Sequence, residues 1–83
     1  MSGEMVSYTD TVDIYVHLLN EGTDVVRPTK AIPLGRMRYK ILPTSDYSPD
    51  LEEWEFPPGS IVECRIENRE GKQVLVAWRK VAE

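Results

Sequence analysis

The side chains best suited to catalysis are few in this chain, which holds one histidine, His17, and one cysteine, Cys64. Asp13 and Tyr15 precede His17 at spacings of two, and alternate residues of a β-strand lie on one face about 7 Å apart, so the three side chains can form a polar row. A histidine acting as a general base needs a nucleophile or a bound water within hydrogen-bond reach, and no serine or cysteine stands in a nucleophile motif. We therefore expect no enzyme activity and interpret His17 as an outward-facing strand residue.

Neither a metal site nor a cofactor is indicated by the spacing of the remaining polar residues. His17 and Cys64 alone do not supply the ligands of a zinc site. The middle of the chain is acidic and contains Asp46, Asp50, Glu52, Glu53 and Glu55. These acids lack the glycine and the ligand spacing of an EF-hand loop, and the glycines of the chain occur singly rather than in a phosphate-binding loop. We interpret the acidic stretch as a solvated loop.

A cationic segment, residues 27–42, lies between two acidic segments and is the strongest candidate for a binding site. Its five basic residues, which no acid accompanies, are Arg27, Lys30, Arg36, Arg38 and Lys40. A spacing of two places the last three on one face of a strand, where the neighbouring strand would add the first two to a cationic patch. Tyr39 falls on the opposite face, so the patch lacks the aromatic platform on which single-stranded nucleic acids stack. The alternative interpretation is a charged outer face balanced by the acidic segments.

Five short strands are predicted to position these residues. The strands are Val12–Leu19, residues 23–27 with a continuation over 29–32, residues 36–42, residues 60–67 and residues 73–81. Apolar and polar residues alternate in the first and fourth strands, which is typical of strands with one buried face. The residues predicted to face the core are Val12, Ile14, Val16, Leu18, Val62, Cys64 and Ile66. Glycine-containing turns are predicted at 20–22, 33–35 and 68–72, and Pro28 predicts an edge or a bulge.

A long loop, residues 43–59, separates the third and fourth strands. Ser48 is a suitable N-cap and Pro49 a suitable first residue for one or two helical turns over residues 48–54. Leu51 and Trp54 would share one face of these turns, and Phe56 follows, so these side chains can cover the fifth strand, which is apolar on both faces. Residues 57–59, Pro-Pro-Gly, predict a rigid turn. Trp54 is either a plug that anchors the loop on the core or an exposed recognition residue, and we interpret it as the plug.

Five strands in meander order predict an all-β fold, a small five-stranded antiparallel SH3-like barrel with one long loop carrying a short helical turn. Closure into a barrel removes the exposed edges of a small sheet. We expect a disordered tail over residues 1–11 and a single domain over residues 12–83.

Composition restricts the location and the partners of the protein. A chain of 83 residues with 41% hydrophobic residues is long enough for one globular domain. A single cysteine excludes an internal disulfide and fits a reducing compartment, and no apolar run is long enough for a membrane helix or a signal peptide. We therefore expect a cytoplasmic protein without a membrane partner. A formal net charge of −4 argues against nonspecific nucleic-acid binding.

Two segments resemble a family of small bacterial proteins for which no activity is established. They are residues 18–28, LLNEGTDVVRP, and residues 54–64, WEFPPGSIVEC. The resemblance extends over residues 12–64, although members tend to carry an aromatic residue where this chain has Val26. It implies a bacterial, cytoplasmic origin and leaves the function open.

The sequence thus favours a non-enzymatic protein-interaction module without a cofactor or a metal. The alternative is a nucleic-acid-binding small barrel that uses the basic strand from Arg36 to Lys40. The candidate binding residues are Arg27, Lys30, Arg36, Arg38, Lys40 and Trp54. The partner is predicted to be another protein, and the oligomeric state is left open.

Overall fold

The computed structural model describes residues 10–22 and 24–81, which form six β-strands and no helix. The strands are β1 Val12–Leu19, β2 Val26–Gly35, β3 Arg38–Ile41, β4 Glu53–Trp54, β5 Ile61–Arg69 and β6 Lys72–Lys80. The predicted all-β fold is confirmed, with one strand more than expected. The predicted tail, residues 1–11, lies almost wholly outside the described residues. In the part of the chain that the structure describes, no helix has the length and apolarity needed to cross a membrane.

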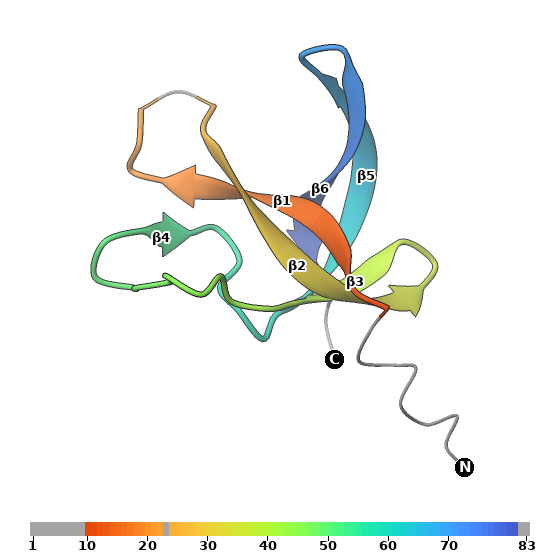
Figure 1. Ribbon diagram of the computed structural model, residues 1–83, viewed down its shortest axis with the longest axis horizontal. Helices are drawn as coiled ribbons and strands as arrows, with labels where there is room; N and C mark the ends of the chain where they lie inside the picture. Colours follow the sequence, from red (N-terminus) through yellow and green to blue (C-terminus); the bar gives the residue numbers. More distant parts are fainter. Residues whose placement is uncertain (1–9, 23, 82–83) are drawn as a thin grey trace.

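Five of the strands pair in a ring (Figure 1). Successive pairs β1–β2, β2–β3, β3–β5 and β5–β6 are antiparallel, as expected of a meander. A parallel pairing between β1 and β6, in which Tyr15 lies opposite Val76, closes the ring. The sixth strand, β4, lies outside the ring and pairs with the end of β1. Most strands thereby gain a neighbour on both sides, which leaves few unpaired sheet edges.

The core fills the inside of this ring. Its buried members are Ile14, Val16, Ala31, Ile41, Trp54, Val62, Cys64 and Ala77. Alternation in β1 places Ile14 and Val16 at 0% exposure, and Val12 and Leu18 pack against the same cluster. The inward face predicted for this strand is therefore confirmed.

The second strand is longer than predicted, and its turn lies elsewhere. β2 runs through Pro28 and through the predicted turn at residues 33–35. Pro28 is tolerated because β3 pairs with β2 only from Ala31 onward, so one edge of the strand beside the proline needs no ladder hydrogen bond. The chain reverses instead at Arg36 and Met37, whose φ angles of 59° and 63° are those of a two-residue hairpin turn. The predicted third strand therefore begins two residues too early, and Arg36 belongs to the turn.

A register shift in the β5–β6 hairpin decides which residues face outward. Glu63 lies opposite Arg79 and Cys64 opposite Ala77, so Trp78 has no partner in β5. An extra residue of this kind is a β-bulge, which breaks the alternation of faces. Val76 and Ala77, which precede the bulge, lie on opposite faces of β6 and are both buried, whereas Trp78 is 43% exposed. After the bulge Arg79 lies opposite Glu63, on the same face as Arg65 and the indole of Trp78.

Farther along, this hairpin projects away from the ring (Figure 1). The inward orientation predicted for Ile66 is wrong, because this residue lies in the projecting part of the hairpin and is 59% exposed.

The long loop contains one turn and a short strand instead of the predicted helical segment. The amides of Leu51 and Glu52 both donate to the carbonyl of Ser48, at 3.0 Å each, and the turn ends there. Glu53 and Trp54 then form β4, opposite Leu19 and Leu18. Leu51 was expected to cover the core, but it is 80% exposed because the turn points it away from the ring.

Trp54 anchors the loop, as the plug interpretation predicted. Its side chain is 4% exposed and belongs to the core cluster. The ring of Tyr47 meets it edge to face, with centroids 4.9 Å apart and an interplanar angle of 71°, and Phe56 packs nearby. Trp54 therefore completes the core of a domain that has few large side chains.

Replacing Trp54 is expected to destabilise the fold strongly. Trp54→Ala should lower the free energy of unfolding by about 3–5 kcal/mol through the cavity it leaves, and Trp54→Phe by about 1–3 kcal/mol. Leu51→Ala, at an exposed position of the same loop, should change it by less than about 0.5 kcal/mol. Urea denaturation followed by circular dichroism measures all three. Equal effects of Leu51→Ala and Trp54→Ala would contradict the anchoring role of the indole.

Candidate functional site

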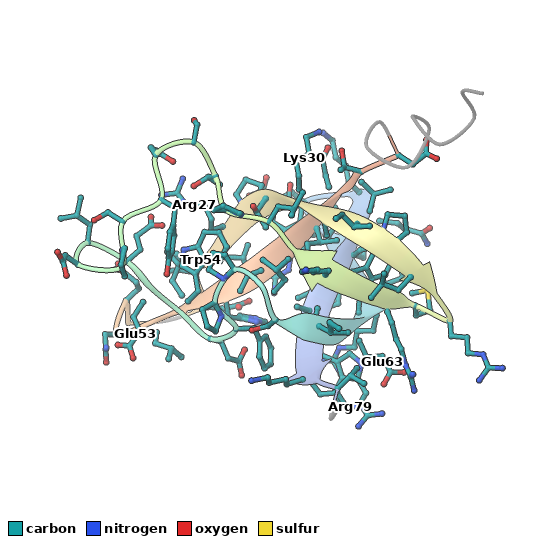
Figure 2. The ribbon with its side chains drawn as sticks, turned by 90° about the horizontal axis from the view of Figure 1, so that it is seen from below. Arg27, Lys30, Glu53, Trp54, Glu63 and Arg79 are labelled. Atoms are coloured by element: carbon teal, nitrogen blue, oxygen red, sulfur yellow. The ribbon has the colours of Figure 1, made fainter. Side chains whose placement is uncertain are left out.

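The predicted cationic patch is divided in the structure. Arg27 and Lys30 lie on β2, and Figure 2 shows both well away from Glu63 and Arg79 of the β5–β6 hairpin. The ammonium of Lys30 pairs with Asp13 at 2.7 Å, so it is balanced by its cross-strand neighbour. Arg27 is therefore separated from Arg38 and Lys40, whereas the register, with Ile32 opposite Lys40, leaves Lys30 diagonally beside Lys40 on the outer face with its charge balanced by Asp13.

Arg27 instead forms the centre of a structural contact. Its Nε donates to Glu52 Oε1 at 3.1 Å, and its Nη2 pairs with Glu52 Oε2. The indole Nε1 of Trp54 donates to Glu52 Oε1 at 3.1 Å. The hydrogen bond from Arg27, followed by that from Trp54, holds the pKa of the Glu52 carboxyl below its usual value. Arg27 thus joins β2 to the long loop, and little of its charge remains for a partner.

Arg38 and Lys40 point outward from β3, as predicted, and both are exposed. Arg38 lies opposite Glu63, which lies opposite Arg79, and residues paired in this way share a face of the sheet. Within the described residues, neither Arg38 nor Lys40 forms an ion pair with a carboxylate. The outer face of β3, β5 and β6 therefore has cations available for a partner.

Trp78 supplies the aromatic residue that the predicted patch lacked. The guanidinium carbon of Arg65 lies 5.6 Å from the centroid of the indole, and that of Arg79 lies 5.5 Å from it. Such distances are those of cation–π contacts. Each arginine is also held by a carboxylate, Arg79 by Glu63 at 2.7 Å and Arg65 by Glu67 at 2.9 Å. An exposed tryptophan is thus fixed between two arginines.

We call this surface the outer basic face, and it consists of Arg38, Lys40, Arg65, Trp78 and Arg79. Trp78, at the centre of this face, was not among the predicted binding residues. Alternation assigned it to an apolar face with Val74 and Val76, and such a face was expected to be covered by the long loop. Trp78 does lie on that face, since Val76 is opposite Arg65, but the pattern gives no sign that the face is left uncovered at Trp78. The sequence signal for an exposed Trp78 is the pair of basic residues that follows it directly, Arg79 and Lys80.

A hollow borders this face on the side of β1. It has a volume of about 360 Å³ and is lined by His17, Leu19, Glu55, Arg65 and Trp78. One side of the indole therefore faces open space rather than packed protein. A side chain from a partner can enter beside the ring without displacing any part of the fold.

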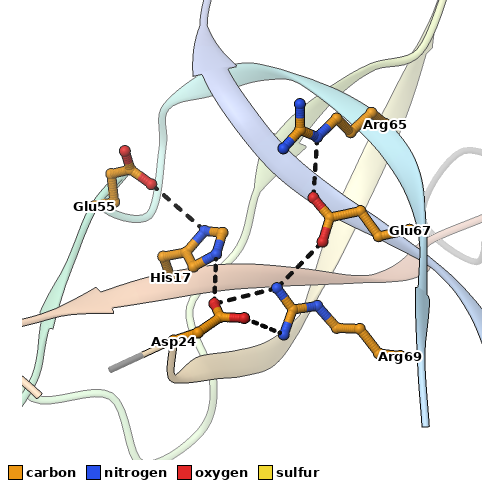
Figure 3. A network of polar contacts seen from close by, with 6 residues as sticks. All are labelled: His17, Asp24, Glu55, Arg65, Glu67 and Arg69. Carbon is orange, nitrogen blue, oxygen red and sulfur yellow. Dashed lines mark hydrogen bonds and ion pairs between the residues drawn. The ribbon is translucent and has the colours of Figure 1, made fainter. Parts of the chain in front are cut away.

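His17 belongs to a chain of polar contacts between the two hairpins (Figure 3). Its Nε2 lies 3.1 Å from Asp24 Oδ1, and its Nδ1 lies 3.7 Å from Glu55 Oε1. Asp24 also accepts from Arg69, at 3.1 and 3.2 Å, and Arg69 in turn pairs with Glu67 at 3.2 Å. The hydrogen bond from Arg69 holds the pKa of Asp24 below its usual value.

The predicted polar row of His17, Tyr15 and Asp13 is not formed, since Asp13 pairs with Lys30. Both ring nitrogens of His17 face carboxylates, those of Asp24 and Glu55. These contacts link β1 to the loop before β2 and to the segment after β4. Cys64 is 3% exposed, and burial raises its pKa to about 11, so its sulfur stays protonated at neutral pH. Among the described residues, no group of three or more His, Cys, Asp or Glu could hold a metal ion.

Comparisons of the chain with models of protein families, with curated proteins and with solved structures found no match. The family resemblance of residues 18–28 and 54–64 therefore stays an expectation. The two segments do meet in space, since Arg27 of the first and Trp54 of the second both donate to Glu52.

The two tryptophans are expected to differ in their access to solvent. Acrylamide should quench the fluorescence of a Trp54→Phe variant, which retains exposed Trp78, several-fold more strongly than that of a Trp78→Phe variant, which retains buried Trp54. Both variants are first shown to be folded by circular dichroism. Equal quenching of the two would mean that the indole of Trp78 is not accessible.

Glu52 is expected to contribute to the pH dependence of stability. Because its folded-state pKa is depressed, its contribution is present above the unfolded value of about 4.5 and is lost as the pH falls through the folded value. Glu52→Gln should therefore be less stable than the parent at pH 7, and this difference should shrink as the pH approaches about 3. Urea denaturation at several pH values measures it, with Glu70→Gln in the exposed β5–β6 turn as the control. A difference that is constant with pH would contradict the role of the charge.

Proposed function

We propose that this chain is a non-enzymatic protein-interaction module that docks its partner on the outer basic face. The observation that carries the proposal is Trp78, an indole 43% exposed on a sheet face and held between Arg65 and Arg79. Tryptophan and arginine are enriched among the residues that dominate binding energy at protein interfaces. In a domain this small, every large side chain is needed for the core. A large aromatic side chain that stays outside the core does not stabilise the fold by burial, and it is available for binding.

The charge of the face favours an acidic partner. Arg38 and Lys40 add unpaired cations, within the described residues, to the two arginines that flank the indole. Glu63 and Glu67 neutralise only part of this charge, because Glu63 pairs with Arg79 alone and Glu67 is divided between Arg65 and Arg69. Complementary charge of this kind raises the association rate and selects the partner more than it raises affinity.

The side chains of the face are also held in place before binding. Arg65 and Arg79 each contact a carboxylate and the indole, so both lose less side-chain freedom on docking than a free arginine. The backbone beneath them is paired on β5 and β6 along nearly their whole length. Preorganisation reduces the entropic cost of association and supports a binding role for this surface.

Several further properties are part of the proposal. We propose that the ring of strands is an SH3-like barrel, supported by its meander order, and that the protein acts in the bacterial cytoplasm, supported by its single buried thiol. The absence of an enzymatic role is supported by His17, whose ring nitrogens both face carboxylates. Trp54 is not included in the docking surface, since its ring is buried.

Binding of single-stranded nucleic acid is a second candidate, favoured by one observation. The outer basic face combines cations with an exposed aromatic ring, the two components that sequence-tolerant single-strand sites use. Arg27 is bound to Glu52 and would not contribute, and Lys30, beside Lys40, is already paired with Asp13. The net charge of −4 acts against this candidate, because it opposes the approach of a polyanion.

A photo-crosslinking residue placed at Lys40 tests the proposed docking surface in living cells. It should yield discrete protein adducts that decrease several-fold when Trp78→Ala is added. The same residue placed at Ser45, exposed on the long loop, should not yield these adducts, and Leu34→Ala, at an exposed position of β2, should leave the Lys40 adducts unchanged. Adducts that persist with Trp78→Ala would overturn the proposed surface.

Fluorescence anisotropy with single-stranded oligonucleotides tests the second candidate. Binding at about 50 mM salt that falls steeply toward about 200 mM and disappears in Arg38→Glu would support it. Binding that is absent, or independent of salt, would exclude it.

A further inference from the structure

The long loop presents a second surface whose chemistry is opposite to that of the outer basic face. Leu51 is 80% exposed at the turn of this loop, with Asp50 before it and Glu53 two residues after it. Glu21 of the β1–β2 loop lies beside them, and these residues line a hollow of about 310 Å³. We call Glu21, Asp50, Leu51 and Glu53 the acidic end. Among the described residues, no Lys or Arg lines this hollow.

The acidic end is held in shape by contacts on both sides. Asn20 Nδ2 donates to Glu53 Oε1 at 2.6 Å, which joins the β1–β2 loop to β4. The amides of Leu51 and Glu52 are bonded to Ser48, and Glu52 is bonded to Arg27. Leu51 therefore stands on a supported turn, and its exposure follows from the local hydrogen bonds.

The two surfaces match in arrangement as well as in charge. Each has one exposed apolar side chain at its centre, Leu51 in one and Trp78 in the other. Carboxylates lie beside the leucine, whereas the guanidinium groups of Arg65 and Arg79 flank the indole, and Glu55 lines the far side of its hollow. An apolar centre within a charged rim is the usual organisation of a protein interface, and the hollow beside Trp78 offers room for an aliphatic side chain.

We propose that the acidic end of one copy of this chain docks on the outer basic face of a second copy. This inference rests on the proposed function and names the partner of that same surface. Leu51 packs against Trp78 beside the hollow, while Asp50 and Glu53 lie near the cations of the face. A second copy is favoured over another acidic protein because the complementary surface is already present on every molecule, at equal concentration.

The relative position of the surfaces determines the kind of assembly. Figure 2 shows Glu53 and Trp54 well apart from Glu63 and Arg79, and Figure 1 shows β4 on the opposite side of the ring from β5, although Leu19 borders both the hollow beside Leu51 and the hollow beside Trp78. When the acidic end of one copy meets the basic face of the next without the reciprocal contact, the contact is heterologous, and each added copy leaves one acidic end and one basic face unoccupied. The expected product is a head-to-tail series that grows with protein concentration. Because the rim is charged and exposed, salt should dissociate it.

Sedimentation velocity of the full chain tests the proposal. At about 20 mM salt, the weight-average mass should rise from the monomer value of 9.5 kDa by about twofold or more as the concentration increases, and it should return to the monomer value at about 500 mM salt.

Two variants separate the surfaces. Arg38→Glu/Lys40→Glu alters only the basic face, and Asp50→Lys/Glu53→Lys alters only the acidic end. Each alone should remain monomeric at low salt. Their mixture should form a 1:1 heterodimer and nothing longer, since each variant retains the surface that the other has lost. Lys72→Glu, at the turn end of the β5–β6 hairpin, should associate like the parent.

Each contrary outcome has a distinct meaning. A parent chain that stays monomeric at every concentration at low salt overturns the inference, as does a mixture of the two variants that stays monomeric although both fold normally by circular dichroism. If the parent is monomeric but Trp78-dependent adducts to another protein form in cells, the docking function stands and only the identity of the partner is wrong. If those adducts are absent as well, both proposals fail.

Discussion

The carboxylate of Glu52 makes the contact on which the rest of this structure depends. It accepts hydrogen bonds from Arg27 of β2 and from the indole of Trp54, two residues farther along its own loop. An indole N–H buried without an acceptor would cost on the order of 1–3 kcal/mol, so Glu52 allows Trp54 to enter the core. The same contact directs the loop along β1, where Glu53 and Trp54 become β4. One part-buried acid thus supports the core, the sixth strand and the exposed turn at Leu51.

The outer surface depends on a different constraint, the closure of the ring. A ring of short strands must twist strongly, and the β5–β6 hairpin accommodates this twist with a bulge at Trp78. Val76 and Ala77 are buried on opposite faces just before the bulge, and the indole of Trp78 lies on the face of Arg65. Arg65 faces outward by alternation, whereas the bulge brings Arg79 to the same face, and both arginines meet the indole from neighbouring strands. The pair of arginines around the exposed indole is therefore a consequence of this bulge.

Charge is separated along the molecule in a way that connects these two constraints. The acidic loop is held at β1 and β4 by the Glu52 contact, and the free cations gather over β3, β5 and β6. Between them, His17, Asp24, Arg69 and Glu67 form a balanced chain of contacts that links the hairpins (Figure 3). Charges that neutralise one another locally stabilise the fold modestly, whereas those left without partners on the outer basic face are available for association.

Local pattern was sufficient for the features that depend on neighbours in the chain. Alternation in residues 12–19 specified β1 and its inward face, and the acidic loop with its large aromatic residues indicated an anchor, which Trp54 provides. The left-handed glycines of the β1–β2 and β5–β6 turns also agree with prediction, with φ angles of 85° at Gly22 and 82° at Gly71. In each case the deciding interaction spans only a few residues, so the sequence determines it directly.

Tertiary structure alone decided the features that depend on contacts between distant segments. Trp54 became a strand residue because β1 offered a free edge to Glu53 and Trp54. Arg27 and Lys30 were removed from the cationic patch by Glu52 and Asp13, acids that no spacing rule connects to them. Arg79 joined Trp78 on the outer face through a one-residue register shift. A strand shows its faces in its own alternation, but its register and its ion-pair partners are set by closure of the whole ring, which no single stretch of sequence contains.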